Sequence, residues 1–206
     1  MADADALFDT HMVLSLALDY PGEDWHERAE AIASVRLPDQ IGAHVDAFLE
    51  VAQEWGVTRL REHYVETFDN RRRCSLYLTY YDMGDTRRRG AALQTMAEVY
   101  RALGYRPSDE ELPDYLPQFL ELSARSRDVL VSEVLAALAP GLQVVKLALE
   151  RLSSPYAHLL AALDASLPEL TEDQRTRVIT LVSQGPPSEL VGLDDHPVPL
   201  TLGDTQ

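Results

Sequence analysis

The sequence predicts an all-α fold, a single-domain helical bundle of about seven to ten helices with no paired strands. Ala and Leu dominate a composition that is 46% hydrophobic, and Gly and Pro are few, at 10 and 12 of 206 residues. Apolar residues recur at helical spacing along most of the chain. The one run with strand-like composition, residues 75–81, has no second run with which it could pair.

Five helices are predicted before residue 104. Each shows an apolar stripe at helical spacing, and they cover residues 5–19, 24–35, 38–55, 57–68 and 85–103. Pro38 suits the first position of its helix. Gly56 and Gly104 suit helix ends in left-handed backbone, which Gly adopts at least cost. Asp85 is expected to cap the fifth helix, and residues 75–81 are expected to form a short buried helix or a turn.

The second half continues the helical pattern. Its stripes predict helices over residues 113–123, 127–152, 154–163 and 168–183. Pro140-Gly141 is expected to break the long helix in two, and Thr171 is the expected cap of the last one. After residue 185 the chain has four Pro and two Gly in 21 residues and no period. We therefore expect a helical domain over 1–185 and an extended or mobile C-terminal tail over 186–206.

The charge of the chain is strongly acidic, with a formal net charge of −16. Such a surface disfavours nucleic acid and anionic membranes, and it favours a basic peptide or protein partner. Residues 59–101 are the exception, since they carry 9 Arg against 6 Asp or Glu. A single Cys excludes an internal disulfide and a Cys-based zinc site. The absence of a signal-like N-terminus or a membrane-length apolar run predicts a cytoplasmic protein without membrane insertion.

Candidate chemical groups are sparse, and each has a structural alternative. Glu23 and His26 have the Glu-x-x-His spacing of di-iron bundles, but no second such pair exists. Cys74 follows Arg71–Arg73, which could activate its thiol, although a lone Cys is more often a small buried residue. The chain has no Gly-rich phosphate loop and no Gly-x-Ser-x-Gly elbow. We therefore expect no catalytic residue and no metal site.

Four segments in a fixed order resemble one known family. They read Y-V-E-T-F-D from Tyr64, R-R-R-C-S-L-Y-L-T-Y-Y from Arg71, G-D-T-R-R-R-G from Gly84 and D-E-E-L-P-D-Y-L-P-Q-F-L-E from Asp109. This set closely resembles the NarJ family, the assembly chaperones or delta subunits of respiratory nitrate reductase, within the wider TorD/DmsD-like group of redox enzyme maturation chaperones. The resemblance is dense from Tyr64 to Leu122 and absent in the tail.

The resemblance implies an all-helical chaperone that is not an enzyme and has no cofactor of its own. Its implied partner is the apo form of the catalytic alpha subunit of nitrate reductase, bound through the N-terminal segment. The chaperone would hold this subunit while the molybdenum cofactor is inserted, before membrane docking. The implied peptide-binding residues are Tyr64, Phe68, Tyr77, Tyr81, Glu111, Asp114, Tyr115 and Phe119. Tyr115 stands where the wider group usually has His, so a role that needs an imidazole is in doubt.

The residues themselves leave alternatives open. Tyr64 and Phe68 lie four apart and suit core packing as well as ligand contact, and Asp114 suits the start of a helix as well as an incoming Arg. We expect Arg71–Arg73 to lock helices internally and Arg87–Arg89 to face a client or cofactor. Alternative functions are a chaperone for a sister molybdenum oxidoreductase, a metal- or thiol-dependent enzyme, and a small-ligand or nucleotide binder that uses the Arg triplets.

Overall fold

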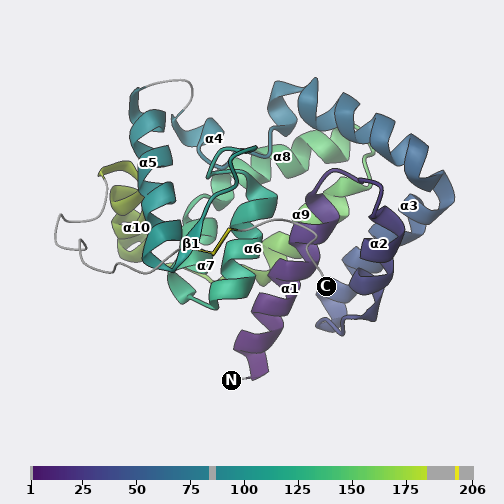
Figure 1. Ribbon diagram of the computed structural model, residues 1–206, viewed down its shortest axis with the longest axis horizontal. Helices are drawn as coiled ribbons and strands as arrows, with labels where there is room; N and C mark the ends of the chain where they lie inside the picture. Colours follow the sequence, from purple (N-terminus) through teal and green to yellow (C-terminus); the bar gives the residue numbers. More distant parts are fainter. Residues whose placement is uncertain (1, 84–86, 185–197, 200–206) are drawn as a thin grey trace.

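The computed structural model describes residues 2–83, 87–184 and 198–199, and it is predominantly α-helical (Figure 1). The α-helices are α1 (Ala2–Leu18), α2 (Trp25–Ser34), α3 (Asp39–Tyr64), α4 (Tyr80–Met83), α5 (Arg87–Ala102), α6 (Leu116–Ser126), α7 (Val129–Ala137), α8 (Ala139–Arg151), α9 (Tyr156–Ser166) and α10 (Glu172–Gln184). A π-helical turn, η1 (Val65–Asp69), and a 3₁₀ turn, η2 (Arg72–Cys74), follow α3. The predicted all-α fold is confirmed.

Helix α1 occupies the middle of the molecule, where it packs mainly on α6 and α9 (Figure 1). Its second half is apolar on nearly every side, and Val13, Leu14, Ala17 and Leu18 are at most 1% exposed. A helix that is apolar all round is stable only when other helices surround it. The chain therefore builds its remaining helices around α1.

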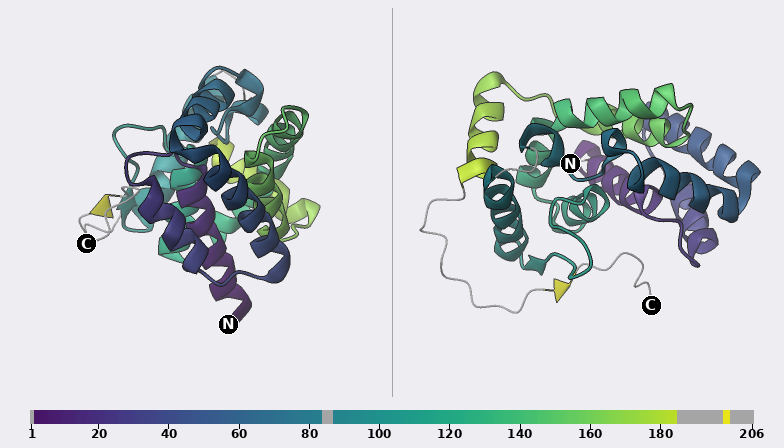
Figure 2. Two further views of the ribbon diagram at one scale, coloured as in Figure 1. Left: turned by 90° about the vertical axis from the view of Figure 1, so that its right-hand side faces the viewer. Right: turned by 90° about the horizontal axis from the view of Figure 1, so that it is seen from above.

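The other helices extend this centre in two directions. Helices α2 and α3 form one end of the molecule, with α3 also packed along α9. Helices α5 and α10 pack on each other at the opposite end, as the views of Figures 1 and 2 agree. The segment between α3 and α5 passes back across the molecule and approaches the start of α6. That approach creates the polar cluster described below.

Several predicted breaks and caps have counterparts in the structure. Gly56 has φ +71° and ψ 163°, so it interrupts the helical backbone, although α3 continues on both sides of this kink. The long helix over 127–152 is broken as predicted, but the break lies at Leu138, between α7 and α8, and Pro140 is in the first turn of α8. At α10, the amide of Gln174 donates to Thr171 Oγ1 at 3.3 Å, and Gln174 Oε1 accepts from the Thr171 amide at 3.0 Å. This reciprocal pair is a capping box.

The prediction of no paired strands is wrong on a small scale. Strand β1 (Tyr105–Arg106) pairs in parallel with β2 (Val198–Pro199), two residues on each side. A two-residue pair needs almost no periodic pattern, which is why the composition of the tail concealed it. The rest of the tail, residues 186–197 and 200–206, and the proposed cap Asp85 lie outside the described residues. The division at residue 185 stays a prediction.

No single helix among the described residues is long and apolar enough to cross a membrane. Helices α7 and α8 reach that length and composition only when they are taken together, and they meet at a bend of 61°.

Candidate functional site

The strand-like segment 75–81 is joined to the chain that enters α6. The amide of Leu78 donates to the carbonyl of Asp114 at 2.9 Å, and the amide of Leu116 donates to the carbonyl of Leu76 at 2.8 Å. These bonds form an isolated antiparallel bridge between Tyr77 and Tyr115. The expected turn is confirmed, but the segment does find a partner, which the sequence pattern did not reveal. A single bridge involves one residue on each side, so it leaves no alternating apolar and polar pattern in the sequence.

Asp114 is fully buried and anchors this junction. Its Oδ2 accepts hydrogen bonds from the hydroxyl of Thr79 at 2.6 Å and from the Thr79 amide at 3.2 Å. The guanidinium of Arg89 lies 3.7 Å from the same oxygen, and its Nε donates to Thr79 Oγ1 at 3.3 Å. A buried carboxylate needs such partners, because its desolvation is otherwise costly. We call Thr79, Arg89 and Asp114 the Asp114 cluster.

The aromatic members of the predicted site form a second buried layer. The hydroxyl of Tyr64 donates to the carbonyl of Leu18 at 3.2 Å and lies 2.8 Å from the hydroxyl of Tyr115. The Tyr64 ring lies 4.7 Å from Phe68, and both rings contact Tyr156. Burial raises the pKa of Tyr64 and Tyr115, so both phenols stay neutral hydrogen-bonding groups. This layer ties α3 to the end of α1 and the start of α6.

The remaining predicted site residues lie partly at the surface. The hydroxyl of Tyr77 donates to Glu111 Oε2 at 2.6 Å, and the Arg89 guanidinium lies 5.9 Å from the Tyr77 ring. Tyr81 donates to the carbonyl of Ser75 at 3.1 Å and packs closely against Gly141, where a Cβ would lie 3.0 Å from that of Tyr81.

The structure therefore separates the eight predicted peptide-binding residues into two groups. Five are buried: Tyr64, Phe68, Asp114, Tyr115 and Phe119. Three are half-buried: Tyr77, Tyr81 and Glu111. Exposed Leu112 lies beside this second group in sequence, and sequence reasoning missed it. We call Tyr77, Glu111 and Leu112 the Tyr77 edge, which is a solvent-accessible part of this region.

The predicted roles of the two Arg triplets are partly exchanged in the structure. Arg71–Arg73 are exposed, and they form no ion pair within the described part of the chain, so the expected internal lock at these residues is wrong. Arg87 and Arg88 are exposed as expected. Arg89 is only 17% exposed and forms the lock through Asp114. The reason is position: Arg89 is in the first turn of α5 and faces the buried carboxylate, whereas Arg71–Arg73 lie in a surface turn.

The other candidates for chemical roles were Cys74 and the pair Glu23 and His26. Cys74 is buried, and burial raises the pKa of its thiol despite the nearby Arg71, which is the opposite of an activated nucleophile. Glu23 and His26 are exposed at the start of α2. Within the described ranges, no three His, Cys, Asp or Glu side chains gather into a metal-binding group.

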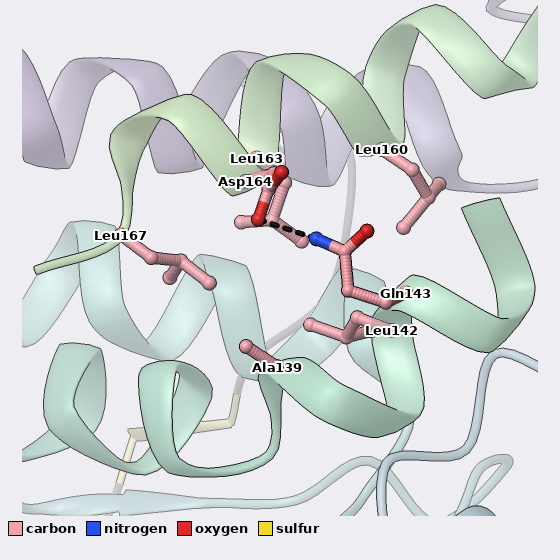
Figure 3. A pocket seen from close by; sticks show the side chains of 7 residues that line it. All are labelled: Ala139, Leu142, Gln143, Leu160, Leu163, Asp164 and Leu167. Atoms are coloured by element: carbon pink, nitrogen blue, oxygen red, sulfur yellow. Dashed lines mark hydrogen bonds between the residues drawn. The ribbon is translucent and has the colours of Figure 1, made fainter. Parts of the chain in front are cut away.

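Two hollows lie away from the predicted site. One, between α8 and α9, is a shallow depression with no room for a water molecule, and Gln143 donates across it to Asp164 (Figure 3). The other, between α2 and α3, has a volume of about 340 Å³. We call it the α2–α3 groove, and its lining residues are Trp25, His26, Ala29, Glu30, Ala33, Leu49, Ala52, Gln53, Gly56 and Val57.

Thr79, Arg89 and Asp114 come from three of the four segments that resemble the NarJ family. The comparison with known families agrees with that resemblance. A family model described as the nitrate reductase delta subunit matches residues 35–174. The chain belongs to this family. The match contains all eight predicted peptide-binding residues and Arg89, whereas α1 and α2 precede it.

Curated relatives carry consistent names. The probable nitrate reductase molybdenum cofactor assembly chaperone NarJ of Bacillus subtilis is 34% identical over 77% of this chain and 88% of that protein. The nitrate reductase molybdenum cofactor assembly chaperone NarJ of Escherichia coli is 31% identical over 72% of this chain, and the match spans 65% of that protein. The nitrate reductase-like protein NarX of Mycobacterium tuberculosis is 39% identical over 72% of this chain, but the match spans only 22% of that protein. The predicted family is confirmed, and it is a family of assembly chaperones and not of enzymes.

Proposed function

We propose that this chain is an assembly chaperone of respiratory nitrate reductase. It binds the apo form of the catalytic alpha subunit through its N-terminal segment and holds it while the molybdenum cofactor is inserted. The chain acts in the cytoplasm, before the subunit docks on the membrane, and it has no cofactor of its own. The observation that carries this proposal is the 34% identity to a probable NarJ chaperone across 88% of that protein's length.

The Tyr77 edge is the proposed contact for the N-terminal segment. It lies where segments 75–79 and 111–115 meet, and the buried Asp114 cluster beneath holds these two segments in register. It offers an exposed leucine, a phenol and a carboxylate, which suit a segment with apolar and basic residues. The net charge of −16 supports fast encounter with such a basic segment.

The buried layer has a positioning role in this proposal. Tyr64 and Tyr115 connect α1, α3 and α6, and Asp114 fixes the approach of α5 through Arg89. The chain performs no bond-making step: it binds, holds and releases a subunit that has yet to receive its cofactor. Release would follow when the folded client withdraws the segment that the Tyr77 edge recognises.

Co-purification tests the proposal. The tagged chain would be expressed with the alpha subunit in cells that cannot make the molybdenum cofactor, and with a subunit that lacks its N-terminal segment as the matched control. We expect recovery of the intact apo subunit and loss of the truncated one. Failure to recover the intact subunit would overturn the client assignment, and equal recovery of both forms would overturn the role of the N-terminal segment.

A further inference from the structure

The α2–α3 groove has a floor that is apolar and already formed. Trp25 is 4% exposed and stands edge-on to Phe48, with 6.1 Å between the ring centroids. The guanidinium of Arg28 lies over the Trp25 ring, 5.7 Å from its centroid, and is held by Asp19. Because these contacts fix the indole, the floor does not have to rearrange when a ligand arrives.

The walls of the groove are built from small residues. Ala29 and Ala33 from α2 face Ala52 and Gly56 from α3, so the two helices leave space between them. The positive φ of Gly56 interrupts α3 at this point, and a Cβ there would meet nothing within 4 Å. The hollow of about 340 Å³ is thus a consequence of side-chain size and of the kink.

The lining of the groove includes one carboxylate, Glu30. Glu50 and Glu54 lie on α3, each one residue after the lining residues Leu49 and Gln53. These three carboxylates are exposed, and none has an ion-pair partner within the part of the chain that the structure describes. The nearest cation on α2, Arg28, is already engaged by Asp19 and Asp24. The groove therefore combines apolar surface with the uncompensated charge of Glu30, on two helices of which α3 also carries Glu50 and Glu54.

We propose that the α2–α3 groove is a docking surface for a cationic amphipathic segment of a partner protein. Apolar side chains of the segment would fill the hollow over Trp25, and flanking Lys or Arg residues would meet Glu30, Glu50 and Glu54. The proposal does not depend on the Tyr77 edge, because the groove is walled partly by α2, which precedes the matched region 35–174.

Charge selects this occupant over two others. The chain's own tail, residues 186–206, contains four Asp or Glu and no Lys or Arg, so these carboxylates would repel it. A second copy of the chain would bring another net charge of −16 to the same carboxylates.

The test uses a 14-residue peptide of Leu and Lys with Leu at helical spacing, and its Leu and Glu counterpart. Affinity for the full chain would be measured by calorimetry at low and high salt. Ala33→Trp fills the groove, and Ala31→Trp is the matched control, because both alanines are exposed on α2 and only Ala33 lines the hollow. We expect Ala33→Trp to weaken Leu/Lys binding by about tenfold, and Ala31→Trp to leave it unchanged.

Charge variants keep the test decisive if Ala33→Trp does not fold. Glu30→Lys alters the lining carboxylate, and Glu169→Lys makes the same charge change at an exposed position between α9 and α10. We expect only Glu30→Lys to weaken the Leu/Lys peptide and to improve the Leu/Glu peptide. The proposal is overturned if wild type does not bind the Leu/Lys peptide, or if the groove variants bind it as tightly as their controls. A failure of this kind leaves the client assignment untouched, since that is tested with the alpha subunit.

Discussion

The junction of segments 75–79 and 111–115 is buried, polar and closely bonded, whereas the α2–α3 groove is open, apolar at its floor and lined in part by the carboxylate of Glu30. Asp114 is 0% exposed and its Oδ2 meets two donors of Thr79. Glu30 is exposed and has no ion-pair partner among the described residues. The first region resembles a structural joint, and the second resembles an unoccupied contact surface.

This difference distinguishes motif residues that hold the helices in place from residues that are available to contact a partner. The recognisable segments from Tyr64 to Glu121 include many residues that the structure buries, so their chemistry is needed to hold the frame. The groove is built from Ala29, Ala33 and Ala52, which no motif would single out. A family motif in this fold therefore marks first the residues that position helices, and only its half-buried members offer contact.

The largest expected effect is at Asp114. Asp114→Ala should lower the free energy of unfolding by about 3 kcal/mol, because it leaves Thr79 and Arg89 without their shared acceptor. Urea denaturation measures this, with Asp109→Ala as an exposed control that should change stability by less than about 0.5 kcal/mol. Equal stability of the two variants would show that Asp114 acts at the surface, as the sequence alone allowed.

A second effect of similar size concerns pH and lies in α1. His11 is 0% exposed, its Nδ1 lies 2.8 Å from Ser123 Oγ, and burial lowers its pKa to about 4. The unfolded chain, with a His pKa near 6.5, binds this proton more readily. The stability contributed by neutral His11 is thus present above about pH 6.5 and is lost as the pH falls towards 4, by up to about 3 kcal/mol.

His11→Asn isolates this contribution. Burial raises the pKa values of Glu121 and Asp19. The stability that such carboxyls contribute to the fold changes in the opposite direction, because it is lost as the pH rises. Only the difference between wild type and His11→Asn therefore reports on His11. Urea unfolding between pH 4 and 7 should show a shallower decline for the variant, and parallel curves would contradict the assignment.

Much of the fold was predictable because its signals are local. Apolar periods, the break at Gly56 and the Thr171 cap depend on residues within a few positions of one another, and the structure confirms them. Pro38, the predicted first residue of its helix, is instead the N-cap that precedes α3. The pairing of Tyr105 with Val198 and of Tyr77 with Tyr115 joins segments that are distant in sequence. A strand of one or two residues shows no alternation of apolar and polar residues, so no pattern in the sequence predicts it.

The sequence indicated that several of the predicted site residues lie close together, but it did not indicate which of them are exposed. The sequence brought together Tyr64, Asp114 and Tyr115, yet burial depends on which helices cover them. It also could not distinguish Arg89 from Arg87 and Arg88, because three adjacent residues of a helix point in three directions. Only the fold decides which of them meets Asp114.

A smaller effect tests the aromatic layer of the frame. Tyr64→Phe should cost about 1 kcal/mol, since it removes the hydrogen bond to the Leu18 carbonyl and leaves the Tyr115 hydroxyl without its partner. Tyr115→Phe should cost less, because Tyr64 keeps Leu18 as acceptor. Thermal and urea unfolding of both variants and of the double variant measure the coupling. Equal costs with no coupling would show that the two hydroxyls do not interact in solution.

The smallest effect on stability is expected at the Tyr77 edge, where binding should change instead. Tyr77→Phe removes the hydroxyl that Glu111 orients but keeps the ring, so we expect less than about 1 kcal/mol of destabilisation. Calorimetry with a peptide of the alpha-subunit N-terminus should show affinity about fivefold lower, which corresponds to about 1 kcal/mol. Glu110→Gln, exposed and adjacent in sequence to Glu111, is the control. Unchanged affinity for Tyr77→Phe, with Ala33→Trp abolishing binding, would move the client's segment from the Tyr77 edge to the α2–α3 groove.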